Sequence, residues 1–222
     1  MKYLSLIIIC LFGHKLCAED IHYIQNNGQW QSNILYKANI PGGELFLENG
    51  KITYNFFDSN HLHHLHHLEM ENPNFNKDEH TINAYAYQVE LINYEKSLNT
   101  IANNPTAYYH NYFLGNNAEK WKGKVPLFEQ VRQNNVFKGI DLLLYSKGTR
   151  FKYDFIVKPN ANTDDIQLKY QGINPTIING NIILDLGFNT LLEKKPYAYQ
   201  IINGKEHEIN CEYVLNDHAG SA

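Results

Sequence analysis

Cysteine is nearly absent from this chain, which has 3 cysteines among its 222 residues. Cys10 and Cys17 fall in an apolar N-terminal segment that we expect to be removed, so Cys211 is the single cysteine of the mature chain. This excludes an intramolecular disulfide, and stability therefore has to come from packing. Cys211 lies within the apolar alternation of residues 209–215, which predicts a buried, unreactive thiol on a strand.

The sequence also lacks the motifs of several enzyme classes. It contains no Gly-x-Ser-x-Gly elbow, no His-Glu-x-x-His pair and no glycine-rich phosphate loop. Asp141 and Asp154 resemble the carboxylate pair of a glycoside hydrolase, because a predicted hairpin brings their strands together. Both are predicted to face solvent, which favours ordinary surface carboxylates. We therefore expect no enzyme activity, no catalytic residue and no cofactor.

Clusters of Lys and Arg are missing as well, and removal of Lys2 and Lys15 with the N-terminal segment takes the formal net charge from -4 to -6. This argues against a nucleic-acid partner. Residues 1–18 have the charge, short apolar run and small final residue of a secretory signal peptide. Lipoprotein processing at Cys17 is a less favoured alternative. No later run is long enough for a membrane-spanning helix.

Strand patterns occupy most of the mature chain. Residues 150–157 alternate between apolar and polar side chains, and the turn 146–149 joins them to the apolar segment 140–145. Asn-Gly pairs, which suit type I′ turns, separate further apolar runs and raise the number of predicted hairpins to four. These pairs are Asn49-Gly50, Asn179-Gly180 and Asn203-Gly204.

These hairpins predict an all-β domain over residues 19–216, either an antiparallel β-sandwich or two packed sub-sheets. The polar segment 107–136 is a candidate division between two sub-sheets. Residues 217–222 are interpreted as a tail at a truncated end. Helical evidence is slight, and the best candidate is a single turn at residues 117–121.

Residues 61–80 break the strand pattern, and we interpret them as an inserted His-rich loop. The metal ligands that this segment offers are His63, His64, His66 and His67. On a helix, His63 and His67 would share a face at the spacing of paired ligands for zinc, nickel or copper. A physiological metal site, adventitious binding of zinc or nickel, and a solvated loop remain open alternatives.

Aromatic residues make up 13% of the chain and include two tryptophans, Trp30 and Trp121. Exposed tryptophan and tyrosine rings would suit a carbohydrate-binding module, because sugar C–H faces pack on flat aromatic planes. Most of the tyrosines lie on alternating strand faces, which favours packing roles. Trp30, Tyr153 and Phe155 are the leading core candidates.

Several motifs follow one another in an order that resembles a known family. The chain is similar to the uncharacterised N-terminal domain of large secreted proteins of Bacteroidetes-type bacteria, which carry SBBP β-propeller repeats and gliding-motility or type IX secretion sorting domains. The resemblance covers about residues 21–215. It rests on segments 26–30, 40–47, 109–116, 139–142, 153–159 and 195–200.

This resemblance implies an exported protein at the cell surface or outside the cell, and it supplies no catalytic residues. The implied partners are a downstream β-propeller or other domains of the same protein, with a surface protein or a glycan as further partners. The chain is either a fragment or a short form, and the short form would favour the periplasm. We expect a non-catalytic presentation or adhesion module, with carbohydrate or metal binding as the alternative and glycoside hydrolysis as a weaker one.

Overall fold

The computed structural model describes residues 20–72, 74–76 and 80–216. The predicted signal peptide and the predicted tail at residues 217–222 lie outside these residues. Within them there is one α-helix, α1 (Ser59–Glu71), and two short 3₁₀ turns at Ala118–Lys120 and Thr163–Asp165. No helix in the described ranges is long and apolar enough to cross a membrane.

The remaining elements are strands, and they account for most of the fold. The first eight are β1 (Tyr23–Gln25), β2 (Tyr36–Ile40), β3 (Gly43–Glu48), β4 (Lys51–Phe57), β5 (Ala84–Leu91), β6 (Asn99–Tyr112), β7 (Lys122–Phe137) and β8 (Ile140–Lys147). The others are β9 (Arg150–Val157), β10 (Leu168–Gln171), β11 (Thr176–Ile178), β12 (Asn181–Asp185), β13 (Thr190–Glu193), β14 (Ala198–Ile202) and β15 (Lys205–Ile209).

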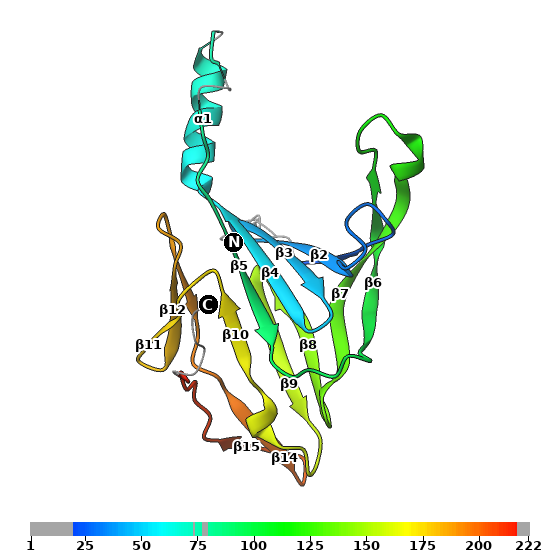
Figure 1. Cartoon of the computed structure of the whole chain (residues 1–222), viewed down its shortest axis with the longest axis vertical. Coiled ribbons are helices and arrows are strands. Elements are labelled where there is room, and N and C mark those ends of the chain that lie inside the picture. The colour runs from blue at the N-terminus through cyan, green and yellow to red at the C-terminus, as the bar shows by residue number, and fades with distance from the viewer. Residues whose placement is uncertain (1–19, 73, 77–79, 217–222) are drawn as a thin grey trace, which may run out of the picture.

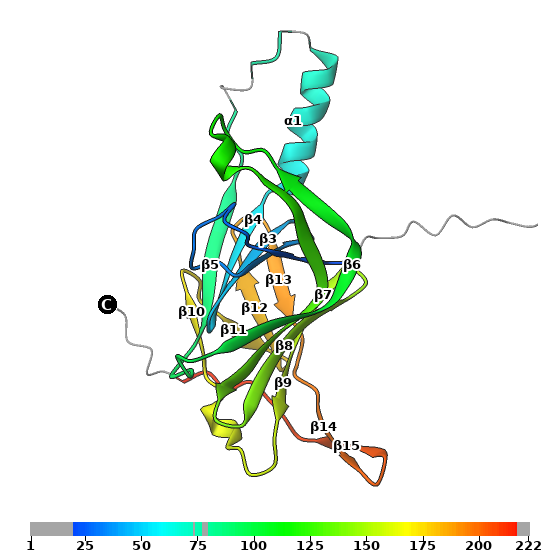
Figure 2. The same cartoon turned by 90° about the vertical axis from the view of Figure 1, so that its right-hand side faces the viewer.

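One antiparallel sheet forms the body of the molecule. Its strand order is β10-β5-β4-β3-β2-β1-β7-β8-β9, with β6 paired to β7 outside this path. The sheet curls into a half-barrel, and the three-stranded sheet β11-β12-β13 lies across its open side (Figures 1 and 2). Strands β14 and β15 form a separate two-stranded sheet. The prediction of an all-β fold built from successive antiparallel hairpins is confirmed.

All four predicted hairpins are present. At Asn179-Gly180 and Asn203-Gly204 both residues have positive φ angles, as a type I′ turn requires. At Asn49-Gly50 the turn joins β3 to β4, but only Gly50 has a positive φ, so this turn is of another type. The β8–β9 hairpin has Lys147 opposite Arg150, so its strands extend further into the turn than the sequence predicts.

The concave side of the half-barrel holds the main core. Alternate residues of the sheet point into it, and Ile182 and Leu184 of β12 close it from the open side. Tyr153 and Phe155 pack against this core, as predicted, although each keeps some exposure. Trp30 is different, because it is half-buried against a smaller cluster of Ile24, Val125 and Leu127 on the other face of the sheet. The fully buried large side chains include Tyr23, Leu45, Leu47, Ile140, Leu144 and Leu184.

Two sequence expectations about the layout are wrong. Residues 107–136 do not divide two sub-sheets, because they form the end of β6 and most of β7, which pairs with β1, β6 and β8 inside the main sheet. Cys211 is not on a strand, since β15 ends at Ile209, and its side chain is only half-buried. Beyond Ile209, the apolar alternation of residues 209–215 therefore does not correspond to sheet pairing.

The expectation that Asp141 faces solvent is also wrong, because its side chain is only 1% exposed. Arg132 Nη2 donates to Asp141 Oδ2 at 2.6 Å, and the Asn135 N–H donates to Oδ1 at 2.7 Å. Lys158 Nζ lies 3.3 Å from Oδ1. Burial alone would raise the pKa of Asp141, but these hydrogen bonds and the Lys158 charge lower it below its usual value. The carboxylate thus fixes β7, β8 and the end of β9 to one another.

We expect Asp141→Asn to lower the free energy of unfolding by about 2–3 kcal/mol at neutral pH, because it weakens bonds to a buried charge. A lowered folded-state pKa stabilises the fold above the unfolded-state pKa of about 3.9, and this stabilisation is lost as the pH falls further. The difference between wild type and variant should therefore shrink in acid. Chemical denaturation at several pH values measures it.

The matched control is Asp154→Asn on the neighbouring strand, where the side chain is exposed. This change should cost about 0.5 kcal/mol or less, as surface substitutions usually do. Equal losses for the two variants would contradict the structural role given to Asp141.

Candidate functional site

The His-rich segment is not a loop over its whole length, because residues 59–71 form helix α1. Asp58 caps the helix by accepting a hydrogen bond from the His61 N–H at 3.0 Å. The helix projects away from the body of the molecule (Figure 1), and none of its residues is buried. A helix of 13 residues that buries none of them is close to the length limit of about 12–15 residues for stability in water.

The helix brings only some of the predicted metal ligands together. The rings of His63 and His67 are 5.1 Å apart between centroids, which is the i, i+4 pairing that the sequence predicts. His66 lies 3.9 Å from Glu69, and His64 is exposed. No group of three or more His, Cys, Asp or Glu side chains converges within the described ranges. Two imidazoles fall short of the three or four protein ligands of a zinc site, so metal binding stays a prediction and should be weak.

The carboxylate pair of a glycoside hydrolase does not form. Asp141 is opposite Ile156 and Asp154 is opposite Leu143, so the two carboxylates are offset along the β8–β9 ladder. Both oxygens of Asp141 already accept hydrogen bonds. Burial and, as the second cause, a hydrogen bond to Asp154 raise the pKa of Tyr145 to about 12. Asp154 therefore interacts with Tyr145, whereas Asp141 interacts with Arg132 and Asn135.

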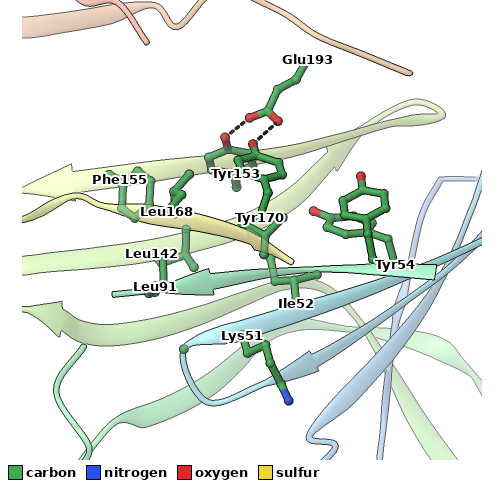
Figure 3. Close-up of a pocket in the computed structure, with 13 residues that line it drawn as sticks. Lys51, Ile52, Tyr54, Leu91, Leu142, Tyr153, Phe155, Leu168, Tyr170 and Glu193 are labelled. Carbon is green, nitrogen blue, oxygen red and sulfur yellow. Dashed lines mark hydrogen bonds between the residues drawn. The ribbon is translucent and has the colours of Figure 1, made fainter. Parts of the chain in front are cut away.

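A more organised polar cluster lies inside the half-barrel, around Glu193 at the end of β13 (Figure 3). The Tyr170 hydroxyl donates to Glu193 Oε2 at 2.8 Å, and the hydroxyls of Tyr153 and Tyr213 donate to Oε1. Tyr54 and Tyr87 are stacked beside them with ring centroids 4.9 Å apart. One carboxylate therefore ties β13 to β9, to β10 and to the C-terminal segment.

The environment keeps these phenols protonated. Burial raises the pKa of Tyr153, Tyr170 and Tyr213 above the usual range, and the neighbouring Glu193 carboxylate raises each of them further. Burial also raises the pKa of Tyr54 and of Tyr87. For Tyr54 the next causes are Tyr87 and then Glu193, and for Tyr87 the next cause is Glu193. The cluster is consequently a set of hydrogen-bond donors around one acceptor.

The cavity beside this cluster is small. Its volume is about 40 Å³, while a single water needs about 10–15 Å³ on the same measure. Sites for organic ligands usually have volumes of about 300–1,000 Å³. The interior can therefore hold a few waters at most, and the Glu193 cluster is better explained as a structural junction than as a ligand site.

A larger hollow lies on the other face of the sheet. This outer groove has a volume of about 680 Å³ and is open to solvent. Its floor consists of side chains from β3, β4 and β5, and its wall is the loop between β1 and β2. The residues that line it are Gly28, Gln29, Trp30, Gln31, Asn33, Ile34, Phe46, Glu48, Lys51, Thr53 and Gln88.

Sequence reasoning identified Trp30 but missed both the outer groove and Glu193. The sequence did carry a signal for the groove. The loop between β1 and β2 is rich in amide side chains, and the alternation of β3, β4 and β5 gives Phe46, Thr53 and Gln88 as outward positions. Glu193 carried no local signal, because its three partners are 20, 23 and 40 residues away in the sequence.

Residues 23–221 match a family described as a domain of unknown function, DUF7948. The match covers nearly the whole chain, and the protein therefore belongs to this family. No curated protein and no solved structure matches the chain.

We expect Tyr170→Phe to lower the free energy of unfolding by about 1.5–3 kcal/mol, because the Glu193 carboxylate loses a donor in a partly buried site. Equilibrium denaturation in urea measures this change. Tyr199→Phe is the matched control, since it removes the same hydroxyl from an exposed ring. If the two variants were equally stable, the Glu193 cluster would have no stabilising role.

Nickel or zinc should increase the helical circular dichroism of the chain, because a metal bound by His63 and His67 links two turns of α1. His67→Ala should abolish this increase, whereas His64→Ala should retain most of it. An increase that survives His67→Ala, or that His64→Ala removes equally, would contradict the i, i+4 site.

Proposed function

We propose that this protein is a non-catalytic module of an exported cell-surface protein, and that it orients or presents other domains and makes adhesive contacts. The observation that supports this best is the exposed hairpin of β14 and β15, which follows the body of the fold. A two-stranded sheet is at best marginally stable in water unless it packs against another element. In the described part of the chain, the main contacts of β14 and β15 are with each other.

The β14–β15 hairpin presents apolar side chains to solvent on both faces. Tyr199 is 52% exposed and Ile201 is 61% exposed on one face, and Ile202 is exposed on the other. Contiguous apolar surface of this kind usually marks an interaction site in a soluble protein. A neighbouring domain of the same polypeptide, such as the β-propeller that the sequence resemblance implies, is the partner that we propose for it.

A second exposed apolar surface, at the tip of the β6–β7 hairpin, supports the adhesive part of the proposal. Phe113 is 65% exposed, and its ring makes an edge-to-face contact with Trp121 at 5.5 Å. Trp121 Nε1 donates to the Gly115 carbonyl at 3.1 Å, which fixes the ring at the surface. This tip, where β6 leads into β7, projects from the half-barrel (Figure 1). Aromatic side chains held in this way are typical of protein-binding surfaces.

Two features support the proposal that the module has no catalytic activity: the small size of the interior cavity and the pairing of the Asp141 carboxylate. The cavity at Glu193 is too small for an organic substrate, and its tyrosines are engaged as donors to one carboxylate. Asp141 is neutralised by Arg132 and Lys158. Export to the cell surface is proposed from the signal-peptide pattern and from the family resemblance.

Hydrogen exchange tests the presentation role. The backbone amides of residues 197–209 should exchange rapidly in the isolated chain and should be protected in the protein purified from its native cells, because a neighbouring domain covers the β14–β15 hairpin there. The amides of β12, which is already part of the core, should be protected equally in both samples and are the internal control. Equal exchange of residues 197–209 in the two samples would refute the proposed docking.

A further inference from the structure

The outer groove combines an aromatic wall with polar groups, and its chemistry is more specific than that of the apolar patches. Trp30 and Phe46 supply ring surface, and Lys37 Nζ lies 5.8 Å and 5.6 Å from the centroids of these two rings. The edge-to-face contact of Trp30 with Tyr112, at 5.4 Å, supports the indole from behind the groove. The aromatic surface is therefore held in place before any ligand arrives.

The loop that forms the groove wall is held by one side chain, Asn26. Its Nδ2 donates to the carbonyls of Gln31 at 2.8 Å and Ile34 at 2.7 Å, and its Oδ1 accepts from the N–H groups of Gly28 and Trp30. A loop with internal bonds of this kind loses little conformational entropy when a ligand binds. The groove wall is thus preorganised.

The charges of the groove balance one another. Lys51 Nζ lies 3.0 Å from Glu48 Oε1, and Asn33 Nδ2 donates to Glu48 Oε2 at 2.7 Å. The nearby Lys37 is paired with Glu44. Figure 3 shows Lys51 pointing away from the tyrosine cluster, on the groove side of the sheet. Because no excess positive or negative charge remains among these four side chains, an ionic ligand gains little here, and a neutral polar ligand is favoured.

The floor of the groove offers donors and acceptors at close spacing. Thr53 and Gln88 are directly opposite each other on β4 and β5, and Gln88 Nε2 donates to Thr53 Oγ1 at 3.1 Å. The Thr53 hydroxyl hydrogen and the Gln88 carbonyl oxygen remain as one donor and one acceptor. The amide of Gln31 adds both kinds of group on the wall. A ligand whose hydroxyls both donate and accept hydrogen bonds fits this arrangement.

The position of the groove within the sheet argues against an extended peptide. Strands β3, β4 and β5 are each paired on both sides in the main sheet, so the floor has no free backbone edge to which a peptide could add. The volume of about 680 Å³ lies inside the usual range of small-ligand sites. Space, ring surface and balanced polarity therefore point to the same class of ligand.

We propose that the outer groove binds a neutral oligosaccharide. The sugar rings pack their C–H faces on Trp30 and Phe46, and their hydroxyls bond to Thr53, Gln88 and Gln31. This site is separate from the β14–β15 hairpin, so the inference does not depend on the presentation role. It gives the module a specific adhesive contact.

The test uses Trp30 fluorescence in a Trp121→Phe background, in which Trp30 is the only tryptophan. Cellohexaose, maltohexaose, mannohexaose, xylohexaose and chitohexaose are titrated to millimolar concentration, and binding is checked by calorimetry. At least one of them should change the fluorescence saturably. Thr53→Val and Gln88→Ala, which alter only surface side chains, should each weaken that binding about 5–10-fold through the loss of hydrogen bonds.

The matched control is Asn39→Ala, which removes an exposed amide from the same outer face of the sheet but outside the groove. Affinity should be unchanged in this variant. The proposal fails if none of the five sugars binds, or if Thr53→Val and Gln88→Ala leave the affinity intact. In each of these outcomes the hydrogen-exchange test of the β14–β15 hairpin remains independent.

Discussion

The fold depends on how a strongly curved sheet closes over tyrosine hydroxyls that cannot all reach water. Glu193 satisfies three of them, because one carboxylate accepts from the hydroxyls of three tyrosines that come from β9, β10 and the C-terminal segment. A buried polar group without a partner would cost about 1–3 kcal/mol, so this junction decides where the three-stranded sheet and the C-terminal segment can lie. Ile182 and Leu184 of the same three-stranded sheet pack into the core.

The two faces of the main sheet consequently have different roles. The concave face is filled by tyrosine and aliphatic side chains, and its remaining cavity admits only water-sized molecules. Surfaces able to contact other molecules lie outside, in the groove beside Trp30, at the β6–β7 tip and on the β14–β15 hairpin. This division is what a rigid scaffold requires, because a ligand or a neighbouring domain can bind without disturbing the core.

The hairpins could be predicted from sequence because turn chemistry is local. Both residues of Asn179-Gly180 and of Asn203-Gly204 adopt the positive φ angles that the turn needs, and the alternation of residues 150–157 fixes which side chains face the core. The helix was not predicted, although Asp58 is a good N-cap and Leu62, Leu65 and Leu68 recur at a helical spacing, because it buries none of its residues and so lacks the broad apolar face of a packed helix.

The remaining errors concern contacts between distant residues. Asp141 has an outward position on β8, but Arg132 from β7 and the Lys158 side chain cover it. The alternation of apolar and polar residues along β8 cannot predict that side chains from other strands bury Asp141. The Glu193 junction is equally hidden from local sequence reasoning, since its partners come from segments that are distant in the sequence.

Helix α1 has a consequence for the evolution of this protein. The ladder between β4 and β5 continues to the pair Phe57 and Ala84, and the Asp58 N–H then donates to the Asn83 carbonyl at 2.9 Å. The insertion thus leaves and re-enters the body at adjacent points, and none of its described residues is buried in the core. Changes in the length or composition of this segment should therefore cost little folding free energy, and the same position should accept a grafted epitope or reporter segment.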